Sequence, residues 1–343
     1  MLAERGLLDL GVTEIDSPPM HLPIRDTGGP STHPNFAEPG INDSSRLFIL
    51  VYTARRRPPR RPQFWKGNLV EEFFAHPAVQ GGIAPFVVGL VVALLLQSAR
   101  LGGLALVAAF ATAVYFVAGF TFMPLTATRK IILLGFAAPV IGMLIDFGFK
   151  ANRTGAAMLA LAAGAAALWI FWPVLSQKGV LPIWQYGGAA AVAVAFMVGF
   201  GQLFLANNGV RAGAAGLGTG LGVGVAAILA ASATYGLYGI ALGAGSGAFL
   251  LVQMIRGRVG VAGATFTLPA MLIAGLVAAA AMFLAQLPWH ALLVLALIPV
   301  GACMPLPSRA RVWQQAVLLS LCTFTIAGVA CYLAWHSSGG TPG

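Results

Sequence analysis

Between Gly81 and Trp335 the chain consists of long apolar stretches separated by very short polar ones. A helix needs about 20 apolar residues to cross the hydrocarbon core of a bilayer, which is roughly 30 Å thick. The pattern predicts ten such helices, which could be arranged as five plus five. They are expected at 81–98, 101–123, 131–149, 155–175, 183–206, 212–232, 234–255, 264–286, 289–306 and 313–335. One broken helix over 212–255 is an alternative, but it would be roughly 65 Å long, twice the membrane thickness.

The amino-acid composition supports this assignment. Hydrophobic residues make up 58% of the 343 residues and charged residues only 9%, whereas soluble domains typically carry about 25% charged residues. The predicted fold class is therefore an all-α polytopic integral membrane protein in contact with the lipid bilayer, and we expect it in the cell inner membrane. The basic residues behind the net charge of +10 lie singly or in pairs between apolar stretches. This pattern is typical of topology signals and does not predict a nucleic-acid partner.

The first 80 residues differ from the rest of the chain. Met1–Asp43 is rich in Pro, Gly, Asp and Ser and has no helical or strand periodicity, so we expect disorder there. Residues 336–343 are expected to form a short flexible C-terminal tail after the transmembrane domain, 81–335. No predicted helix depends on residues 1–69, so the protein should insert without them, and a native start near Val70 is an open hypothesis.

A polybasic segment precedes the first predicted helix. One hypothesis is that its arginines bind anionic lipid headgroups, at about 1 kcal/mol each. The other is that they form a solvated flank that keeps the N-terminus in the cytoplasm. The arginines are Arg55, Arg56, Arg57, Arg60 and Arg61.

The loop charges predict an orientation that conflicts with this tail. We call the side of the N-terminus side A and the opposite side side B. Side B receives eight basic residues, namely Arg100, Lys150, Arg153, Arg211, Arg256, Arg258, Arg309 and Arg311. The loops on side A carry only Arg129, Lys130 and Lys178. The positive-inside rule therefore places side B in the cytoplasm, whereas the bases of the tail favour side A.

Asp146 is the only Asp or Glu after Glu72 and lies in a predicted transmembrane helix. Such a carboxylate costs about 2.5–3.5 kcal/mol at the membrane centre, so it needs a partner or a function. The spacing to Lys150 favours an ion pair at the side-B interface, with Arg153 as a second partner. The alternative is a carboxylate that couples transport to protons or cations, close to a kink at Pro139.

Two further patterns are candidates for sites. Thr126 or Thr128 could cap the helix that begins near Arg129, and the helix dipole with Arg129 and Lys130 could bind an anion; a plain helix cap is the alternative. Glycines spaced by four residues predict close packing of two neighbouring helices, or a backbone-lined path. They are Gly216, Gly220, Gly224, Gly239, Gly243 and Gly247.

Other polar side chains in the apolar stretches, including Gln202, Gln253, Thr219, Tyr235 and Tyr238, are expected to bridge helices. No catalytic set, metal ligand set or cofactor motif is predicted, so an enzyme is not expected. Two hypotheses of function remain. The first is a secondary transporter or permease for a small solute, and the second is a non-transporting protein with a structural, assembly or lipid-organising role. A homo-oligomer is an open hypothesis under either of them.

Overall fold

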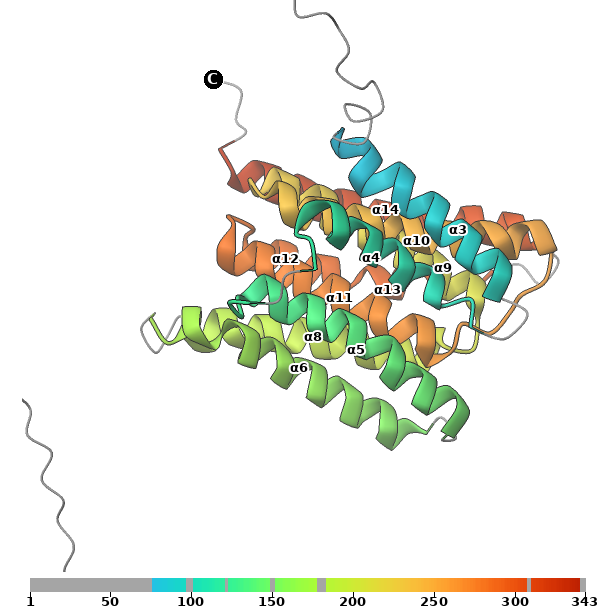
Figure 1. Cartoon of the computed structure of the whole chain (residues 1–343), viewed down its shortest axis with the longest axis horizontal. Helices are drawn as coiled ribbons and strands as arrows, with labels where there is room; N and C mark the ends of the chain where they lie inside the picture. Colours follow the sequence, from blue (N-terminus) through green and yellow to red (C-terminus); the bar gives the residue numbers. More distant parts are fainter. Residues whose placement is uncertain are drawn as a thin grey trace, which may run out of the picture. The chain divides into compact units, whose positions relative to one another are not determined.

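The computed structural model describes residues 76–96, 101–120, 123–148, 152–177, 183–306 and 310–339 (Figure 1). All of them belong to one unit, Phe64–Gly343. The expectations for residues 1–75, including the five arginines of the polybasic segment, lie outside the described residues. Four of the loop bases, Arg100, Lys150, Lys178 and Arg309, also lie outside them.

Every regular element in these ranges is a helix. The first half contains α3 (Ala84–Leu96) after the π-helical turn η1 (Val79–Ile83), then α4 (Leu104–Val117), α5 (Ala127–Gly148), α6 (Arg153–Leu175), and α8 (Gly188–Phe200) between the π-helical turns η3 (Ile183–Gly187) and η4 (Gly201–Leu205). The second half contains α9 (Gly209–Leu229), α10 (Ala233–Arg256), α11 (Gly263–Leu284), α12 (Trp289–Ala296), α13 (Ile298–Gly301) and α14 (Val312–Ser337).

Eight helices in the described ranges are long and apolar enough to cross a membrane. The predicted fold class, an all-α multi-pass membrane protein, is therefore confirmed. Two of the ten predicted helices are shorter than expected, since 101–123 forms Leu104–Val117 and 289–306 forms Trp289–Gly301. The first ends where Gly119 adopts a φ of +64°. The second is interrupted ahead of Pro299, which is the second residue of α13 and cannot donate a backbone hydrogen bond to the preceding turn.

The stretch 212–255 forms two helices, as the length argument predicted. They are joined by a turn in which Ala231 has a φ of +64°. Ser232 N–H closes this turn by donating to Ala227 O at 2.9 Å. The turn returns the chain directly, so that α9 and α10 lie against each other along their length (Figure 1).

Several connections on side B touch one another. Gly209 N–H donates to Gly260 O at 2.7 Å, and Gly263 N–H donates to Ala206 O at 2.9 Å. The connection between α8 and α9 therefore meets the one between α10 and α11. The Arg211 guanidinium reaches Met304 O, in the connection before α14, at 3.4 Å.

The opposite ends of the same helices meet on side A. Gln286 N–H, after α11, donates to Ala230 O, after α9, at 3.1 Å. The side chain of Thr128, at the start of α5, lies 2.9 Å from the hydroxyl of Tyr235, at the start of α10. Successive helices therefore run in alternate directions. This agrees with the alternate assignment of the loops to sides A and B.

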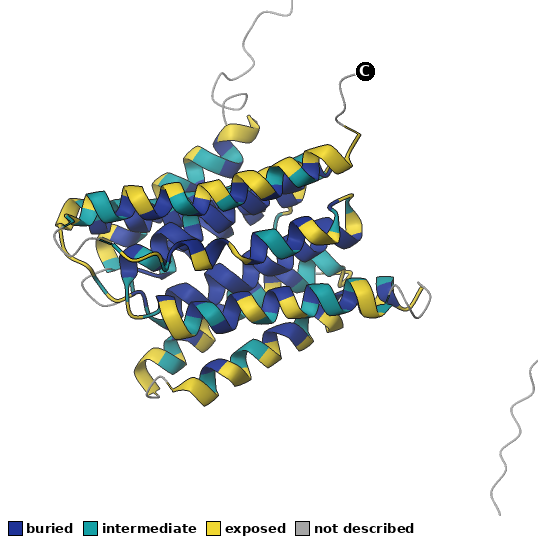
Figure 2. Ribbon diagram, turned by 180° about the vertical axis from the view of Figure 1, so that it is seen from behind, coloured by how far each residue is buried: buried dark blue, intermediate teal, exposed yellow. Residues whose placement is uncertain are grey.

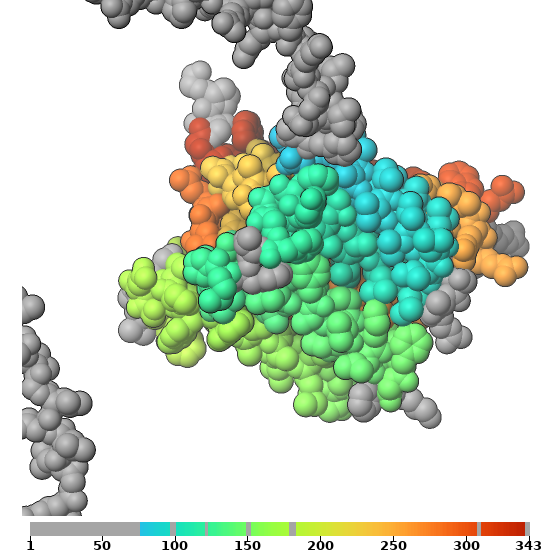
Figure 3. Space-filling view, in the orientation of Figure 1, coloured from blue at the N-terminus to red at the C-terminus, as the bar shows by residue number. Residues whose placement is uncertain are grey.

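Helix α11 forms the core of the bundle. In its most apolar 18-residue window 94% of the residues are buried, against 33% for α5 and 28% for α14. Figure 2 shows the buried residues concentrated on the inner helices and the exposed residues on the outer ones. Figure 3 shows the face formed by α3, α4 and α5. A helix that is apolar all round is stable when other helices enclose it, which matches the sequence of α11.

Candidate functional site

The start of α11 is a buried helix end, and such an end leaves four backbone N–H groups without partners inside the helix. Two of them are paired with the connection between α8 and α9, because Ala262 N–H and Gly263 N–H both donate to Ala206 O, directly after η4, at 3.1 and 2.9 Å. Ala262 itself contributes no side-chain cap. The other two N–H groups need acceptors from elsewhere in the chain.

Asp146, near the C-terminal end of α5, supplies both acceptors. Its Oδ1 accepts from Ala264 N–H at 2.7 Å, and its Oδ2 accepts from Thr265 N–H at 2.8 Å. The Thr265 hydroxyl donates to the same Oδ2 at 2.6 Å. Three donors and the positive end of the helix dipole thus stabilise the negative charge. The single acid of the transmembrane domain caps the most buried helix from a different helix.

Gly263 makes this approach feasible. Its φ of +70° lies in the left-handed region, and a Cβ atom built on it would lie 2.9 Å from Asp146 Cγ. A larger residue there would be strained and would also displace the carboxylate. The glycine at the first position of α11 therefore belongs to the same site as Asp146 and Thr265.

These contacts add a role that neither hypothesis for Asp146 included. Lys150 lies outside the described residues, so the ion pair with it stays a prediction. Arg153 begins α6 and is exposed. Asp146 lies at the side-B end of α5, and the hypothesis of a coupling carboxylate likewise stays a prediction. Pro139 lies inside α5, which continues as a helix on both sides of it.

Polar bonds continue from this cap into the bundle. The Thr267 hydroxyl, fully buried on α11, donates to Gly263 O at 2.8 Å. It also accepts from Gln202 Nε2, in η4, at 3.0 Å. Gln253, 1% exposed, accepts from Gly260 N–H at 2.9 Å. Gln202 therefore bridges two helices, as expected, whereas Gln253 is bonded to the connection that follows its own helix. Together these contacts fix the connections on side B.

The residues of the candidate anion site have separate partners. Thr126 precedes α5, and its hydroxyl faces Arg129 N–H at 3.4 Å, a weak capping distance. Thr128 instead faces Tyr235. Arg129 Nη1 donates to Pro124 O at 2.7 Å, and Lys130 Nζ lies 4.3 Å from the centre of the Trp169 ring. The geometry corresponds to the alternative of a capped helix start with flanking bases, while anion binding stays a prediction.

Four of the six glycines of this set, Gly220, Gly224, Gly239 and Gly243, lie at backbone contact. A Cβ atom on Gly239 would lie 2.5 Å from Gly224 Cα, and one on Gly220 would lie 2.7 Å from Gly243 Cα. A Cβ atom on Gly216 would lie 3.0 Å from Ser246 Cβ. Gly247 differs from the others of the set, since its Cβ would meet only the end of Leu217, at 3.3 Å. Close packing of the two helices is the arrangement that this geometry fits.

Two hydroxyls in the interior have no hydrogen-bond partner among the described residues, namely Thr219 Oγ1 and Tyr238 Oη. Thr219 is 0% exposed and Tyr238 is 1% exposed. The Tyr238 ring packs edge-on against Phe110 of α4, with ring centres 5.6 Å apart. Sequence reasoning expected both to bridge helices, and here neither does so. Unpaired polar groups are costly in such an environment, so each calls for a water molecule or a ligand.

Sequence reasoning did not single out Gly263, Thr265 and Thr267. Their signal was weak, because Gly and Thr are common in transmembrane helices. A usable hint was the connection 257–263, which contains three glycines directly before an apolar helix without a capping side chain of its own. A helix that lacks a local cap must take its acceptors from elsewhere.

Comparisons with known proteins add no assignment. No protein-family model matches the chain, and neither curated proteins nor solved structures give a match.

Proposed function

We propose that this protein is a transporter for a small neutral solute, with α11 as its central element. The observation that carries the proposal is the pair of unpaired, buried hydroxyls on Thr219 and Tyr238. A bundle that served packing alone would gain stability from valine and phenylalanine at these positions, because no hydroxyl would then be buried unpaired. Hydroxyls that meet water or a solute during transport explain why polar groups are kept there.

The neutral class of solute follows from the interior chemistry. The buried polar side chains in the described ranges are uncharged. Besides Tyr238, they include Thr219, Ser246, Gln253, Thr265, Thr267, Ser320 and Thr323. An ion that crossed such an interior would lack a compensating charge, whereas hydroxyls and amides can exchange hydrogen bonds with a neutral polar solute.

In this proposal, the cap on α11 is the contact that opens during transport. Transport requires the central helix to shift against its neighbours, and Asp146 holds its first turn to α5 through three hydrogen bonds. Two glycines have positive φ next to this cap, Gly257 in the segment before α11 and Gly263 at its first position. We propose that Asp146 works as a latch, which sets how readily the side-B end of α11 moves relative to α5.

For orientation, we propose that side B faces the cytoplasm and that the membrane is the cell inner membrane. The described side-B ends carry Arg153, Arg211, Arg256, Arg258 and Arg311, against Arg129 and Lys130 on side A. Exposed tryptophans cluster at the other end, with Trp169 at 54%, Trp172 at 57% and Trp184 at 75% exposure. Such a cluster marks the depth of a membrane interface, whereas the excess of basic residues on side B indicates which side faces the cytoplasm.

The test is uptake by the purified full chain in proteoliposomes, with a panel of labelled polyols, amides, amino acids, one organic anion and one organic cation. We expect uptake of at least one neutral solute. Thr219→Val and Tyr238→Phe remove only the hydroxyls, and each should lower that uptake by about tenfold, since a site built around a hydrogen bond discriminates strongly. Their thermal stability should stay equal or rise.

Matched controls lie on the outer surface of α14. Thr325→Val removes a hydroxyl that donates to Leu321 O within its own helix, and Tyr332→Phe removes one from a ring that is 59% exposed. Both should transport like the unmodified protein. If Thr219→Val and Tyr238→Phe also transport normally, or if no solute of the panel is taken up by folded protein, the proposal is wrong.

A second candidate function is a structural or assembly role without transport. The observation in its favour is the backbone contact between α9 and α10, where Gly220 and Gly239 leave no room for side chains. This pair of helices is suited to a rigid bundle. Folded, inserted protein that transports nothing, and that becomes more stable with Thr219→Val, would be the outcome expected from this role.

A further inference from the structure

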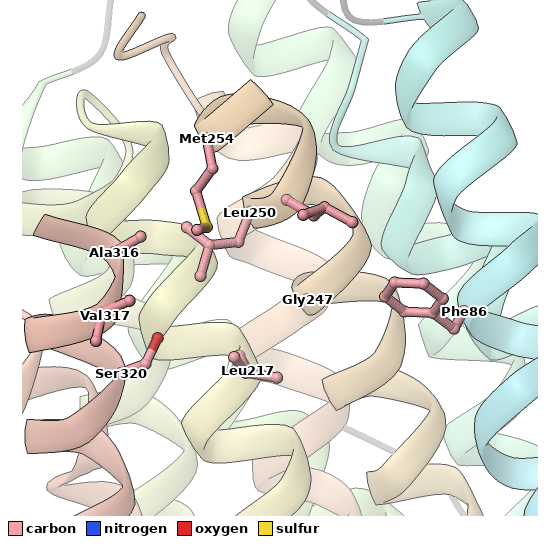
Figure 4. A pocket seen from close by; sticks show the side chains of 9 residues that line it. Phe86, Leu217, Gly247, Leu250, Met254, Ala316, Val317 and Ser320 are labelled. Atoms are coloured by element: carbon pink, nitrogen blue, oxygen red, sulfur yellow. The ribbon is translucent and has the colours of Figure 1, made fainter. Parts of the chain in front are cut away.

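A groove on the outer surface lies between α3 and α14, with α10 as its floor (Figure 4). Its volume is about 280 Å³. The lining is almost entirely apolar, and includes Phe86 of α3, Leu250 and Met254 of α10, and Val317 and Ser320 of α14. The groove faces outward from the bundle, so in a membrane its surroundings are lipid.

Glycine makes the groove deep. Gly247 lies at its floor, where a larger side chain would fill it (Figure 4). Its Cβ would meet only Leu217 Cδ1, at 3.3 Å, so packing between α9 and α10 does not require a glycine here. This separates Gly247 from the neighbouring glycines, which do have backbone contacts.

The distance from the far end of the groove to the side-B arginines matches one leaflet of a bilayer. Gly247 and Ser320 lie nine positions from Arg256 and Arg311, the arginines at the side-B ends of their helices. At a rise of 1.5 Å per residue, the groove therefore reaches roughly 13–14 Å below those arginines. Half of the hydrocarbon core is about 15 Å thick. A groove of this depth takes an acyl chain whose headgroup lies at side B.

The side-B end of the groove is surrounded by positive charge. Arg256, Arg258 and Arg311 are exposed, and no ion pair of their guanidinium groups is found within the described ranges. Asp146, the one acid in those ranges, has both oxygens bonded to α11. Trp313, 48% exposed, lies one helical turn before Val317, at the depth typical of an interfacial tryptophan. The groove and its end together complement an anionic amphiphile.

We propose that this groove binds one anionic phospholipid of the side-B leaflet. One acyl chain lies between α3 and α14 over Gly247, and Arg256 and Arg311 bind the phosphate-containing headgroup, with Arg258 beside them. The affinity comes from apolar contact along the chain and from the two arginines at the headgroup. The preference for an anionic over a zwitterionic lipid comes from the arginines alone.

The test is native mass spectrometry of the full chain released from mixed micelles that contain equal amounts of phosphatidylglycerol and phosphatidylcholine with identical acyl chains. We expect one retained phosphatidylglycerol. The double variant Arg256→Gln/Arg311→Gln should lower the ratio of retained phosphatidylglycerol to phosphatidylcholine by about fivefold or more. Arg153→Gln, an exposed arginine of the same side on α6, is the matched control and should leave the ratio unchanged.

A second variant tests the groove itself. Val317→Trp fills it from a side chain that is 52% exposed, so it should fold, and it should lose the retained lipid of either kind. Val329→Trp, on the same helix at 50% exposure, is its control and should retain lipid. An unchanged lipid ratio in the double arginine variant would overturn the proposal, as would equal retention in the two tryptophan variants. A dimer that Val317→Trp dissociates would also overturn it, because a second copy would then occupy the groove.

Discussion

Two helix pairs in this bundle are held together by opposite means. Helices α9 and α10 touch through glycines, with Gly220 against Gly243 and Gly239 against Gly224, so their backbones meet without side chains between them. Helices α5 and α11 are joined by the carboxylate of Asp146, which accepts hydrogen bonds from Ala264 and Thr265. The first contact depends on the absence of atoms and the second on the presence of two oxygens.

The difference predicts two kinds of sensitivity. Van der Waals contact between backbones extends along several turns, and any added volume separates the helices over that whole length. A carboxylate cap acts at one point, and its loss leaves two N–H donors without acceptors at the end of one helix. The first contact is therefore suited to a fixed part of the bundle, and the second to a contact that can open.

The largest effect should come from adding volume between α9 and α10. Gly239→Val places atoms where the Cβ alone would lie 2.5 Å from Gly224 Cα. We expect a loss of about 3 kcal/mol or more in the free energy of unfolding, because neither backbone can relax without the other. Unfolding in mixed micelles of a mild detergent and dodecyl sulfate measures this.

The control for this change is Gly188→Val, at the start of α8, where a Cβ atom would meet nothing within 4 Å. It should cost well under about 1 kcal/mol, mainly through the lower helix propensity of valine. Similar losses for the two variants would mean that valine is harmful anywhere in this bundle, and the backbone contact would lose its special status.

The next effect in size should come from the carboxylate. Asp146→Asn keeps the shape but replaces one acceptor oxygen by a donor that faces an N–H group. We expect a loss of about 1–3 kcal/mol, the usual cost of leaving a buried donor unpaired or removing a cap. Arg153→Gln, a nearby exposed change, should stay within about 0.5 kcal/mol.

Double-mutant cycles then separate the cap from the predicted ion pair. Asp146→Asn should be strongly non-additive with Thr265→Val if the hydrogen bonds to α11 stabilise the protein. It should be non-additive with Lys150→Gln if the ion pair does so. Coupling to Lys150 alone would mean that Asp146 acts through the interfacial ion pair that its spacing from Lys150 predicts, and not through the cap on α11.

These two contacts also show what sequence can reveal here. The glycine contact repeats with the helix, so a spacing of four residues reveals it in the sequence. Two members of the set differ, since Gly216 and Gly247 meet side-chain atoms only. The partners Asp146 and Thr265 lie 119 positions apart, and no periodicity connects them. The presence of a single acid marked Asp146 as important, but its partners depended on which helix end lay beside it.

The same reasoning applies to the helices themselves. Apolar length located all ten apolar segments, since the cost of exposing backbone in lipid leaves few alternatives. It overestimated α4 and the segment Trp289–Gly301, because length counts apolar residues and not the backbone angles of Gly119 or the missing donor of Pro299. The interior position of Thr219 and Tyr238 could not be predicted, since a lone hydroxyl gives no sign of which side it faces.

The smallest effect should come from a third kind of contact, between α5 and α6. Lys130 Nζ lies 4.3 Å from the centre of the Trp169 ring, and Trp169 is 54% exposed. A cation–π contact at such an exposed site is worth about 0.5–1 kcal/mol. Lys130→Met should therefore cost about 0.5 kcal/mol, and a cycle with Trp169→Leu should recover most of that amount as coupling. Trp172→Leu, at 57% exposure one turn further on, is the control and should show none.

Added sulfate distinguishes this contact from the predicted anion site. If Lys130 only contacts the Trp169 ring, sulfate should change the stability of neither the unmodified protein nor Lys130→Met. If Lys130 binds an anion, sulfate should stabilise only the unmodified protein.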